Sequence, residues 1–262
     1  MSKFIDKLSR FSQGESQAFG FTARQSSSPK PKIQLVASMA AEDAEPLSAR
    51  AAGADAVLLK ISKPAAAVEA LQKLTKSLPD IILGGWLQGG GNGDIERLTK
   101  AGCDFIVFPA ASTPLAIAKN NKETGKILDV ESSLSEGLLR TVNELPVDAV
   151  LIAGEEKEQP LTWQRLMGFR RFADLLTKPL LVSVTSQVTG EELLALWEAG
   201  VTAVVVEIDA KQPEDRLMKL RQEIDKLEFS TRRNRRGGAL VPNAGQRAGR
   251  PATEEDDDED DE

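Results

Sequence analysis

Ala52-Gly53-Ala54-Asp55 runs directly into Ala56-Val57-Leu58-Leu59, and the chain repeats this pattern three more times, at residues 101–108, 145–152 and 199–206. In each copy a short turn precedes a strand that is apolar throughout, which is typical of a strand buried on both faces. Four more apolar runs alternate with these copies, at residues 33–37, 81–83, 127–130 and 180–184. Eight strands that alternate with helical segments predict an α/β fold, a closed parallel (β/α)8 TIM barrel.

The spacing of the repeated pattern supports closure. Measured between Asp55, Asp104, Asp148 and Thr202, successive copies lie 49, 44 and 54 residues apart. Each interval holds two β/α units, so the repeat suggests quarter-barrels. An open doubly wound sheet would need a reversal of strand order, which no feature of the sequence marks.

The helices are expected between the strands, at residues 44–52, 64–78, 114–120, 133–145, 162–176, 190–199 and 213–227, with a further helix opened by Asp94. Ser133 and Glu136 have the spacing of a capping box at the start of one helix. In helix 162–176 we expect four large apolar residues to face the sheet: Trp163, Leu166, Phe169 and Phe172.

The chain divides into three parts. Residues 1–31 form an N-terminal arm with a short amphipathic helix at 2–12, which we expect to cap the bottom of the barrel rather than to dock on a partner or a membrane. The barrel spans residues 32–227. Residues 228–262 lack an apolar period and are expected to be a disordered tail that adds nothing to the stability of the barrel.

The tail is basic and then acidic. It carries an arginine cluster that could contact a polyanion, but a solubilising role is the preferred interpretation, so nucleic acid is not an expected partner; the cluster is Arg232, Arg233, Arg235 and Arg236. Residues 254–262 hold nine of the 40 acids, so in the rest of the chain the 33 basic residues exceed the remaining acids by two.

The composition excludes several kinds of chemistry. Histidine is absent, which rules out Ser-His-Asp and Cys-His nucleophile systems and most zinc or iron sites. A single cysteine, Cys103, excludes an internal disulfide and fits a reducing compartment; we expect it to be buried and inert. With neither a signal-peptide pattern nor an apolar run long enough to span a membrane, the sequence predicts a cytoplasmic protein that does not enter the membrane.

The helix–Ala-Gly-x-Asp–strand units resemble those of the ribulose-phosphate-binding and aldolase-type barrels. The run Ala49-Arg50-Ala51-Ala52-Gly53-Ala54-Asp55-Ala56-Val57-Leu58-Leu59 is similar to a unit of indole-glycerol-phosphate synthase. The resemblance implies a phosphate site made by glycine-rich turns after the seventh and eighth strands. This chain instead has Thr185-Ser186-Gln187 and Glu207-Ile208-Asp209 at those turns, so we expect the usual phosphate site to be lost.

Barrel sites lie at the C-terminal ends of the strands, where polar residues gather in this chain. Lys60 could form a Schiff base with a substrate or hold a substrate carboxylate. The alternative interpretation is that Lys60 has no catalytic role and is a solvated lysine paired with Glu207. Glu131 and Glu207 could act as a general acid and base, or could bind magnesium together with Asp209. The alternative interpretation is that these carboxylates form an ordinary polar rim of the barrel. The expected ligand-binding residues are Ser38, Trp86, Gln88, Thr185 and Ser186.

These residues leave two classes of function open. The first is a catalytically degenerate barrel that serves as a binding or scaffold protein, and the second is a lyase or aldolase-like enzyme acting on a small organic acid. No metal site or cofactor is assigned. A flavin-binding barrel is a third, weaker interpretation, because flavin phosphate uses the missing glycines.

The glycine-rich loop at residues 89–93 could cradle a phosphate, but the carboxylate of Asp94 would repel an anion there. The preferred interpretation is that these residues form a flexible loop.

Overall fold

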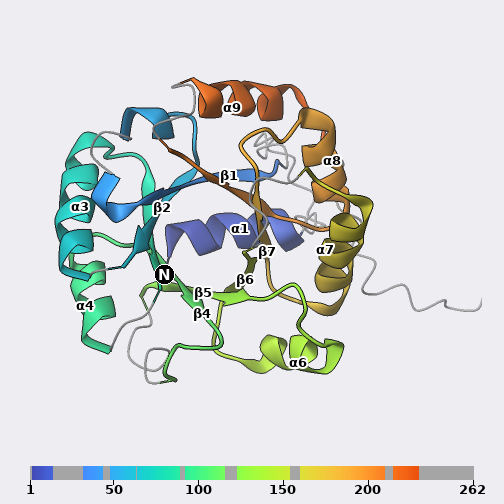
Figure 1. The fold of residues 1–262 in the computed structure, drawn as a ribbon, viewed down its shortest axis with the longest axis horizontal. Coiled ribbons are helices and arrows are strands. Elements are labelled where there is room, and N and C mark those ends of the chain that lie inside the picture. Colours follow the sequence, from blue (N-terminus) through green and yellow to red (C-terminus); the bar gives the residue numbers. More distant parts are fainter. Residues whose placement is uncertain are drawn as a thin grey trace, which may run out of the picture. The chain divides into compact units, whose positions relative to one another are not determined.

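Eight parallel strands close into a barrel in the computed structural model, which describes residues 2–13, 32–43, 48–62, 64–88, 92–115, 123–153, 160–209 and 215–229 (Figure 1). The strands are β1 Gln34–Ala40, β2 Ala56–Ile61, β3 Ile82–Leu87, β4 Phe105–Pro109, β5 Gly125–Val130, β6 Ala149–Ile152, β7 Leu180–Val184 and β8 Ala203–Glu207. They pair in chain order, and β8 pairs with β1. The predicted (β/α)8 barrel is confirmed.

Helices surround the strands (Figure 1): α3 Pro64–Ser77, α4 Asn92–Lys100, α6 Glu136–Thr141, α7 Trp163–Leu175, α8 Gly190–Glu198 and α9 Arg216–Lys226. Short 3-10 helices cover Ala41–Asp43, Ser48–Ala51 and Val142–Glu144. Each strand is buried on both faces, because alternate residues face either the barrel interior or these helices. On β2, for example, Ala56 and Leu58 pack in the interior, whereas Val57 and Leu59 pack under the helices.

The repeated sequence pattern builds the N-terminal end of the barrel. Gly102 and Gly200 follow α4 and α8 with φ of 102° and 103°, a left-handed conformation that favours glycine. The next residue in each case donates its N–H to a helix carbonyl at 3.0 Å, Cys103 to Leu98 and Val201 to Leu196. This is the Schellman arrangement, which ends the helix and turns the chain into the next strand.

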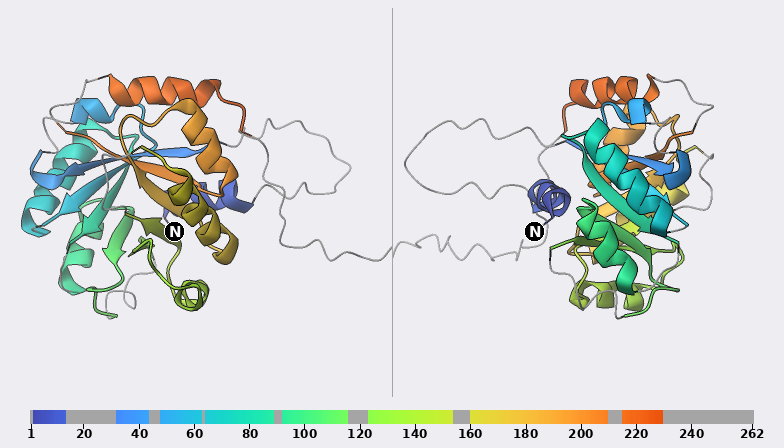
Figure 2. Two further views of the ribbon diagram at one scale, coloured as in Figure 1. Left: turned by 45° about the vertical axis from the view of Figure 1, so that its right-hand side comes forward. Right: turned by 90° about the vertical axis from the view of Figure 1, so that its left-hand side faces the viewer.

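Helix α1, Lys3–Gln13, caps this end of the barrel, as expected for the N-terminal helix (Figure 2). Phe4 and Leu8 are fully buried in the barrel interior, and the Phe4 ring stacks on Phe105 with centroids 4.4 Å apart. Asp104 accepts hydrogen bonds from the first backbone N–H groups of the helix, those of Lys3 at 2.9 Å and Phe4 at 3.0 Å. One carboxylate of the repeated pattern therefore satisfies helix donors about a hundred residues away in sequence.

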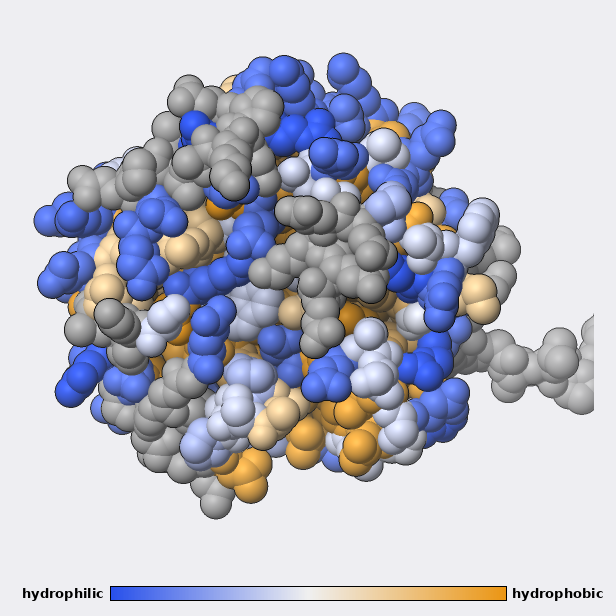
Figure 3. Space-filling view, viewed as in Figure 1, coloured by the Kyte–Doolittle hydropathy of each residue, from blue (hydrophilic) through white to orange (hydrophobic). Residues whose placement is uncertain are grey.

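Two helix predictions were wrong in detail. Helix α6 begins at Glu136 with Ser135 as its N-cap, and the hydroxyl of Ser133 donates to Glu131 instead of forming a capping box. Its Leu138 is 56% exposed, and Figure 3 shows hydrophobic residues at the surface over α6. In α7, Phe169 and Phe172 are buried as expected, but Trp163 is 82% exposed.

Several expectations fall partly or wholly outside the described residues. These are the first part of helix 44–52, most of helix 114–120, most of the glycine-rich loop, and the tail with its arginine cluster. In the described part of the first of these, residues 48–51 form a 3-10 helix. No helix in the described part of the chain is both long and apolar enough to cross a membrane.

Phe229 extends the barrel unit beyond the expected boundary at residue 227. Its side chain is 9% exposed and meets the indole of Trp197 edge to face, with centroids 5.4 Å apart. A chain that ends at Glu228 should therefore be less stable than one that ends at Phe229, by about 2 kcal/mol of unfolding free energy, because the aromatic contact and its buried area are lost. Urea unfolding of the two chains measures the difference, and coincident midpoints would place the boundary back at 227.

Candidate functional site at the barrel mouth

A cavity of about 540 Å³ opens at the C-terminal ends of the strands, and we call it the mouth cavity. Strands β1, β2, β3, β7 and β8 and the loop after β7 supply its walls: Ser38, Lys60, Trp86, Ser183, Val184, Thr185, Ser186, Gln187, Val205, Glu207 and Asp209. Its volume lies in the range of about 300–1,000 Å³ that is typical of small-molecule sites.

Strand alternation explains why polar side chains reach this cavity. On β2, Leu58 lies in the interior core, so the side chain two residues further, Lys60, also faces the interior. On β8 the same relation takes Val205 to Glu207. The apolar interior thus ends one layer below the mouth, and the last inward position of each strand is open to a polar residue.

Lys60 and Glu207 meet across the mouth. The Lys60 ammonium donates to the Glu207 carboxylate, although the two residues are 147 positions apart in sequence. They come together because β1 lies between β2 and β8 and pairs with both. The Lys60 side chain is 12% exposed and that of Glu207 is 42% exposed, so the lysine is held from within the cavity and the carboxylate reaches solvent. The Lys60 Nζ also lies 6.0 Å from the centroid of the Trp86 ring.

Asp129 is a site residue that the sequence analysis missed. It occupies the last inward position on β5, on the same face of the strand as the buried Ile127, and accepts a hydrogen bond from the Trp86 indole N–H at 3.2 Å. Burial raises the pKa of Asp129 to about 6, against the opposing effect of hydrogen bonds from Trp86 and the Ala153 backbone. The available signal was a carboxylate inside the apolar run Ile127-Leu128-Asp129-Val130.

Most of the predicted site residues lie together. Ser38, Trp86, Thr185 and Ser186 line the mouth cavity with Lys60 and Glu207. Glu131 and Gln88 are exposed and lie outside the lining. Both follow the end of a strand by one residue, where the chain is already leaving the barrel. Among the described residues, no three acidic or cysteine side chains gather in a way that could hold a metal ion.

The turns after β7 and β8 use their backbone donors internally. The N–H of Gln187 donates to the Thr185 hydroxyl at 3.2 Å, and that of Val188 donates to the Thr185 carbonyl at 3.2 Å. After β8, the N–H of Ile208 donates to the Ser38 carbonyl at 2.7 Å. A phosphate at this position would need such groups to be unengaged, so the backbone agrees with the missing glycines.

The raised pKa of Asp129 predicts a pH-dependent stability. Because the folded state holds this proton to a higher pH than the unfolded state, the contribution is complete below about pH 4 and is lost as the pH rises through about 6. Asp129→Asn keeps an acceptor for the Trp86 indole but cannot ionise. As the pH is raised from 4.5 to 7.5, we expect the unfolding free energy of the variant to increase relative to that of wild type by about 1–2 kcal/mol. This figure is reduced because Asp129 is partly solvated.

Urea unfolding at several pH values measures this difference. Glu131→Gln is the matched control, because Glu131 is an exposed carboxylate two residues away on the same segment. A wild-type-minus-variant difference that does not change with pH would show that Asp129 is ionised throughout the range.

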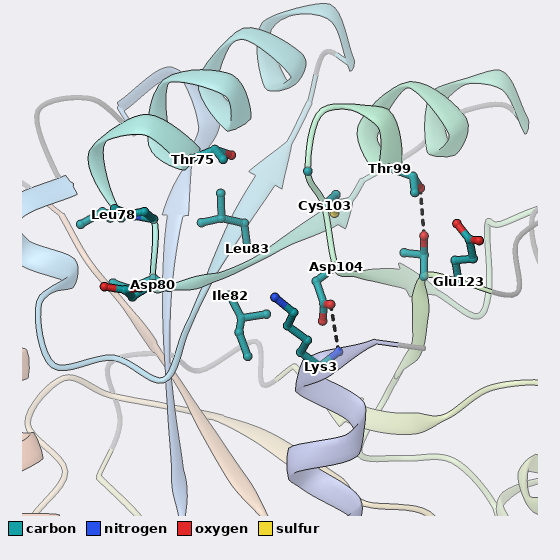
Figure 4. A pocket seen from close by; sticks show the side chains of 14 residues that line it. Lys3, Thr75, Leu78, Asp80, Ile82, Leu83, Thr99, Cys103, Asp104 and Glu123 are labelled. Carbon is teal, nitrogen blue, oxygen red and sulfur yellow. Dashed lines mark hydrogen bonds between the residues drawn. The ribbon is translucent and has the colours of Figure 1, made fainter.

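A second cavity, of about 490 Å³, lies at the opposite end of the barrel beside the start of α1 (Figure 4). The Lys3–Asp104 hydrogen bond borders it, as does the one between the hydroxyls of Thr99 and Thr124, at 2.9 Å. Cys103 is buried there, donates to the Phe105 carbonyl, and has its thiol pKa raised to about 12 by burial, so it is unreactive at neutral pH. The hydrogen bonds and the buried thiol beside this cavity therefore stabilise the fold and do not form a reactive site.

A third cavity, of about 740 Å³, is an apolar groove along α7 and α8. The exposed Trp163 and Met167 line it, and its charged rim includes Arg170, Arg171 and Asp174. The rim carries both signs of charge, which favours no particular partner chemistry.

The closed barrel defines the class of protein: a (β/α)8 barrel, a fold that it shares with solved enzyme barrels. A mutant tryptophan synthase α-subunit from Pyrococcus furiosus has a TM-score of 0.58 at 12% identity, with 74% of this chain and 97% of that chain covered. Orotidine 5′-phosphate decarboxylase from Pyrococcus horikoshii OT3 has a TM-score of 0.56 at 13% identity, with coverage of 73% and 100%. At these identities the similarity establishes the fold alone. No protein-family model and no curated protein matches the sequence.

Proposed function

We propose that this protein is a binding barrel that takes a small polar organic ligand into the mouth cavity and has lost the phosphate handling of the ribulose-phosphate-binding barrels. The observation that carries the proposal is the Lys60–Glu207 pair, held inside a cavity of about 540 Å³. An ion pair at this depth offers donors and an acceptor side by side to a ligand that excludes water from both.

The pairing itself argues for binding rather than for catalysis. The Lys60 nitrogen is engaged by the Glu207 carboxylate, whereas a nucleophilic lysine needs a nitrogen lone pair directed at its substrate. Glu131, the second carboxylate expected to take part in acid–base chemistry, lies outside the cavity lining. The turns after β7 and β8 supply neither glycines nor unengaged backbone donors at Gln187, Val188 and Ile208 for a phosphate.

A thermal-shift screen against panels of metabolites and divalent metals tests the proposal, because a ligand that binds only the native state raises its melting temperature. We expect a hit that shifts wild type and fails to shift Lys60→Met. Lys219→Met is the control, since it breaks an exposed ion pair with Asp215 and neither residue lines the mouth cavity. A hit that shifts Lys60→Met as strongly as wild type would place the ligand elsewhere.

The second candidate is a lyase or aldolase-like enzyme acting on a small organic acid. It is favoured by one observation: the Lys60 amine is mostly buried and contacts a carboxylate able to accept its proton. Glu207 would take a proton from the ammonium, the neutral amine would add to a substrate carbonyl, and loss of water would leave an iminium on Lys60.

Reductive trapping separates the two candidates. Wild type is incubated with pyruvate or another 2-oxo acid and sodium borohydride, and the intact mass is measured. A mass increase that maps to Lys60 and disappears in Lys60→Met would support the enzyme. An unchanged mass, together with a thermal-shift ligand, would support the binding barrel.

A further inference from the structure

Two buried hydroxyls in the mouth cavity have no hydrogen-bond partner among the residues that the structure describes. Ser38 is 1% exposed and Ser183 is 8% exposed, and the Oγ atoms of both are unsatisfied. They lie on β1 and β7, the two strands that flank β8, and both belong to the cavity lining. Buried hydroxyls are nearly always paired, because an unpaired one destabilises the fold. Two in one cavity point to a ligand that carries hydrogen-bonding groups.

The charges of the cavity disfavour an anionic ligand. Among the described residues that line it, Lys60 is the only cationic one, and Glu207 already contacts this lysine. Asp209 adds a second carboxylate to the lining. A phosphate or carboxylate group entering the cavity would displace Glu207 from Lys60 and then face two negative charges in a partly desolvated space.

The remaining groups suit a compound with several hydroxyls. A ligand hydroxyl can donate to Glu207 and accept from Lys60 at the same time, so it can enter the ion pair without breaking its charge balance. The Trp86 indole N–H is engaged by Asp129, which leaves apolar ring surface for the carbon skeleton of the ligand. Ser38 and Ser183 can each donate and accept a hydrogen bond.

We propose that the mouth cavity recognises an uncharged polyhydroxy compound, of the free sugar or alditol class, and that Ser38 and Ser183 are specificity-determining residues. This inference rests on the proposed binding function and goes beyond it by naming the chemical class of the ligand. It separates this chain from barrels that bind the same carbon skeletons as phosphate esters.

Isothermal titration calorimetry with matched compounds tests the inference. The probes are ribose, ribitol and glucose, each compared with a phosphorylated counterpart such as ribose 5-phosphate or glucose 6-phosphate, and gluconate serves as a carboxylate. At least one uncharged compound should bind, and its phosphate ester should bind more than tenfold more weakly. Ser38→Ala and Ser183→Ala should each weaken binding about threefold to tenfold. Ser77→Ala, on the exposed face of α3, should leave it unchanged.

The outcomes distinguish this inference from the function on which it rests. Tighter binding of a phosphate ester or of gluconate, lost in Lys60→Met but retained in both serine variants, would keep the mouth cavity as a ligand site and overturn the proposed class. Binding of an uncharged compound that neither serine variant weakens would overturn the role of the two hydroxyls. Absence of binding by all probes, with both serine variants at least as stable as wild type, would overturn the ligand class and remove the support for a ligand site.

Discussion

Phe4→Ala should lower the free energy of unfolding by about 3–5 kcal/mol, although residue 4 lies outside the sequence of the barrel itself. The Phe4 side chain is fully buried and stacks on Phe105 in the barrel interior. Phe105 in turn fills space that only a glycine leaves open, since a Cβ on Gly84 would lie 2.3 Å from its ring. Removing the Phe4 ring leaves a cavity in the lowest interior layer that rigid strands cannot close.

Equilibrium urea unfolding measures this loss, and Arg10→Ala is the control, because Arg10 is an exposed residue of the same helix. The control should differ from wild type by less than about 0.5 kcal/mol. A Phe4→Ala chain that unfolds within about 1 kcal/mol of wild type would show that α1 leaves the end of the barrel in solution.

Asp55→Ala should cost about 3 kcal/mol, because it leaves several donors without their acceptor. The Asp55 side chain is 9% exposed and accepts from Lys7 at 2.6 Å, Arg221 at 2.8 Å and the Leu35 N–H at 2.9 Å. These donors belong to α1, α9 and β1, so this carboxylate of the repeated pattern ties the two ends of the described chain to the barrel. The 17% exposed Arg221 would lose its more buried partner.

Asp225→Ala is a closely matched control. Asp225 also pairs with Arg221, at 3.3 Å, but its side chain is 50% exposed, so its removal should cost less than about 1 kcal/mol. Unfolding of both variants under the same conditions gives the comparison. Equal losses would mean that the attraction to Arg221 matters and the burial of Asp55 does not.

Local pattern was sufficient for the strands and for the turns that precede them. The strands are buried on both faces, so their sequences are mostly apolar and are recognised as short apolar runs. The glycines of the repeated pattern are also explained locally, because the residue that follows a helix adopts a left-handed conformation that favours glycine. The error in α7 has an equally local cause: residues three apart rotate about 60° per step on a helix of 3.6 residues per turn, so Trp163 and Phe172 lie on opposite sides. Phe172 is buried and Trp163 is exposed.

The candidate site shows where local pattern stops. Lys60, Glu207 and Ser38 were identifiable because each stands at the C-terminal end of a predicted strand, and position along a strand is a local property. Trp86 was identified as a residue of the loop after the predicted third strand, and the structure extends that strand to Leu87. Asp129 was missed and Glu131 was preferred because the two residues are two positions apart, so that both would face the barrel interior if the strand continued to residue 131. Whether the last inward residue of β5 is 129 or 131 depends on where the chain leaves the barrel.

The sequence by itself determined that this protein is a closed barrel of eight strands, since the alternation of doubly buried strands and helices has few other compact solutions. Only the tertiary structure decided which side chains meet. Closure brings β8 against β1 and so places Glu207 on Lys60 across 147 residues, and it buries two serines without partners on either side of β8. Such contacts depend on the stagger and curvature of the whole sheet, to which every strand contributes and which no short segment encodes.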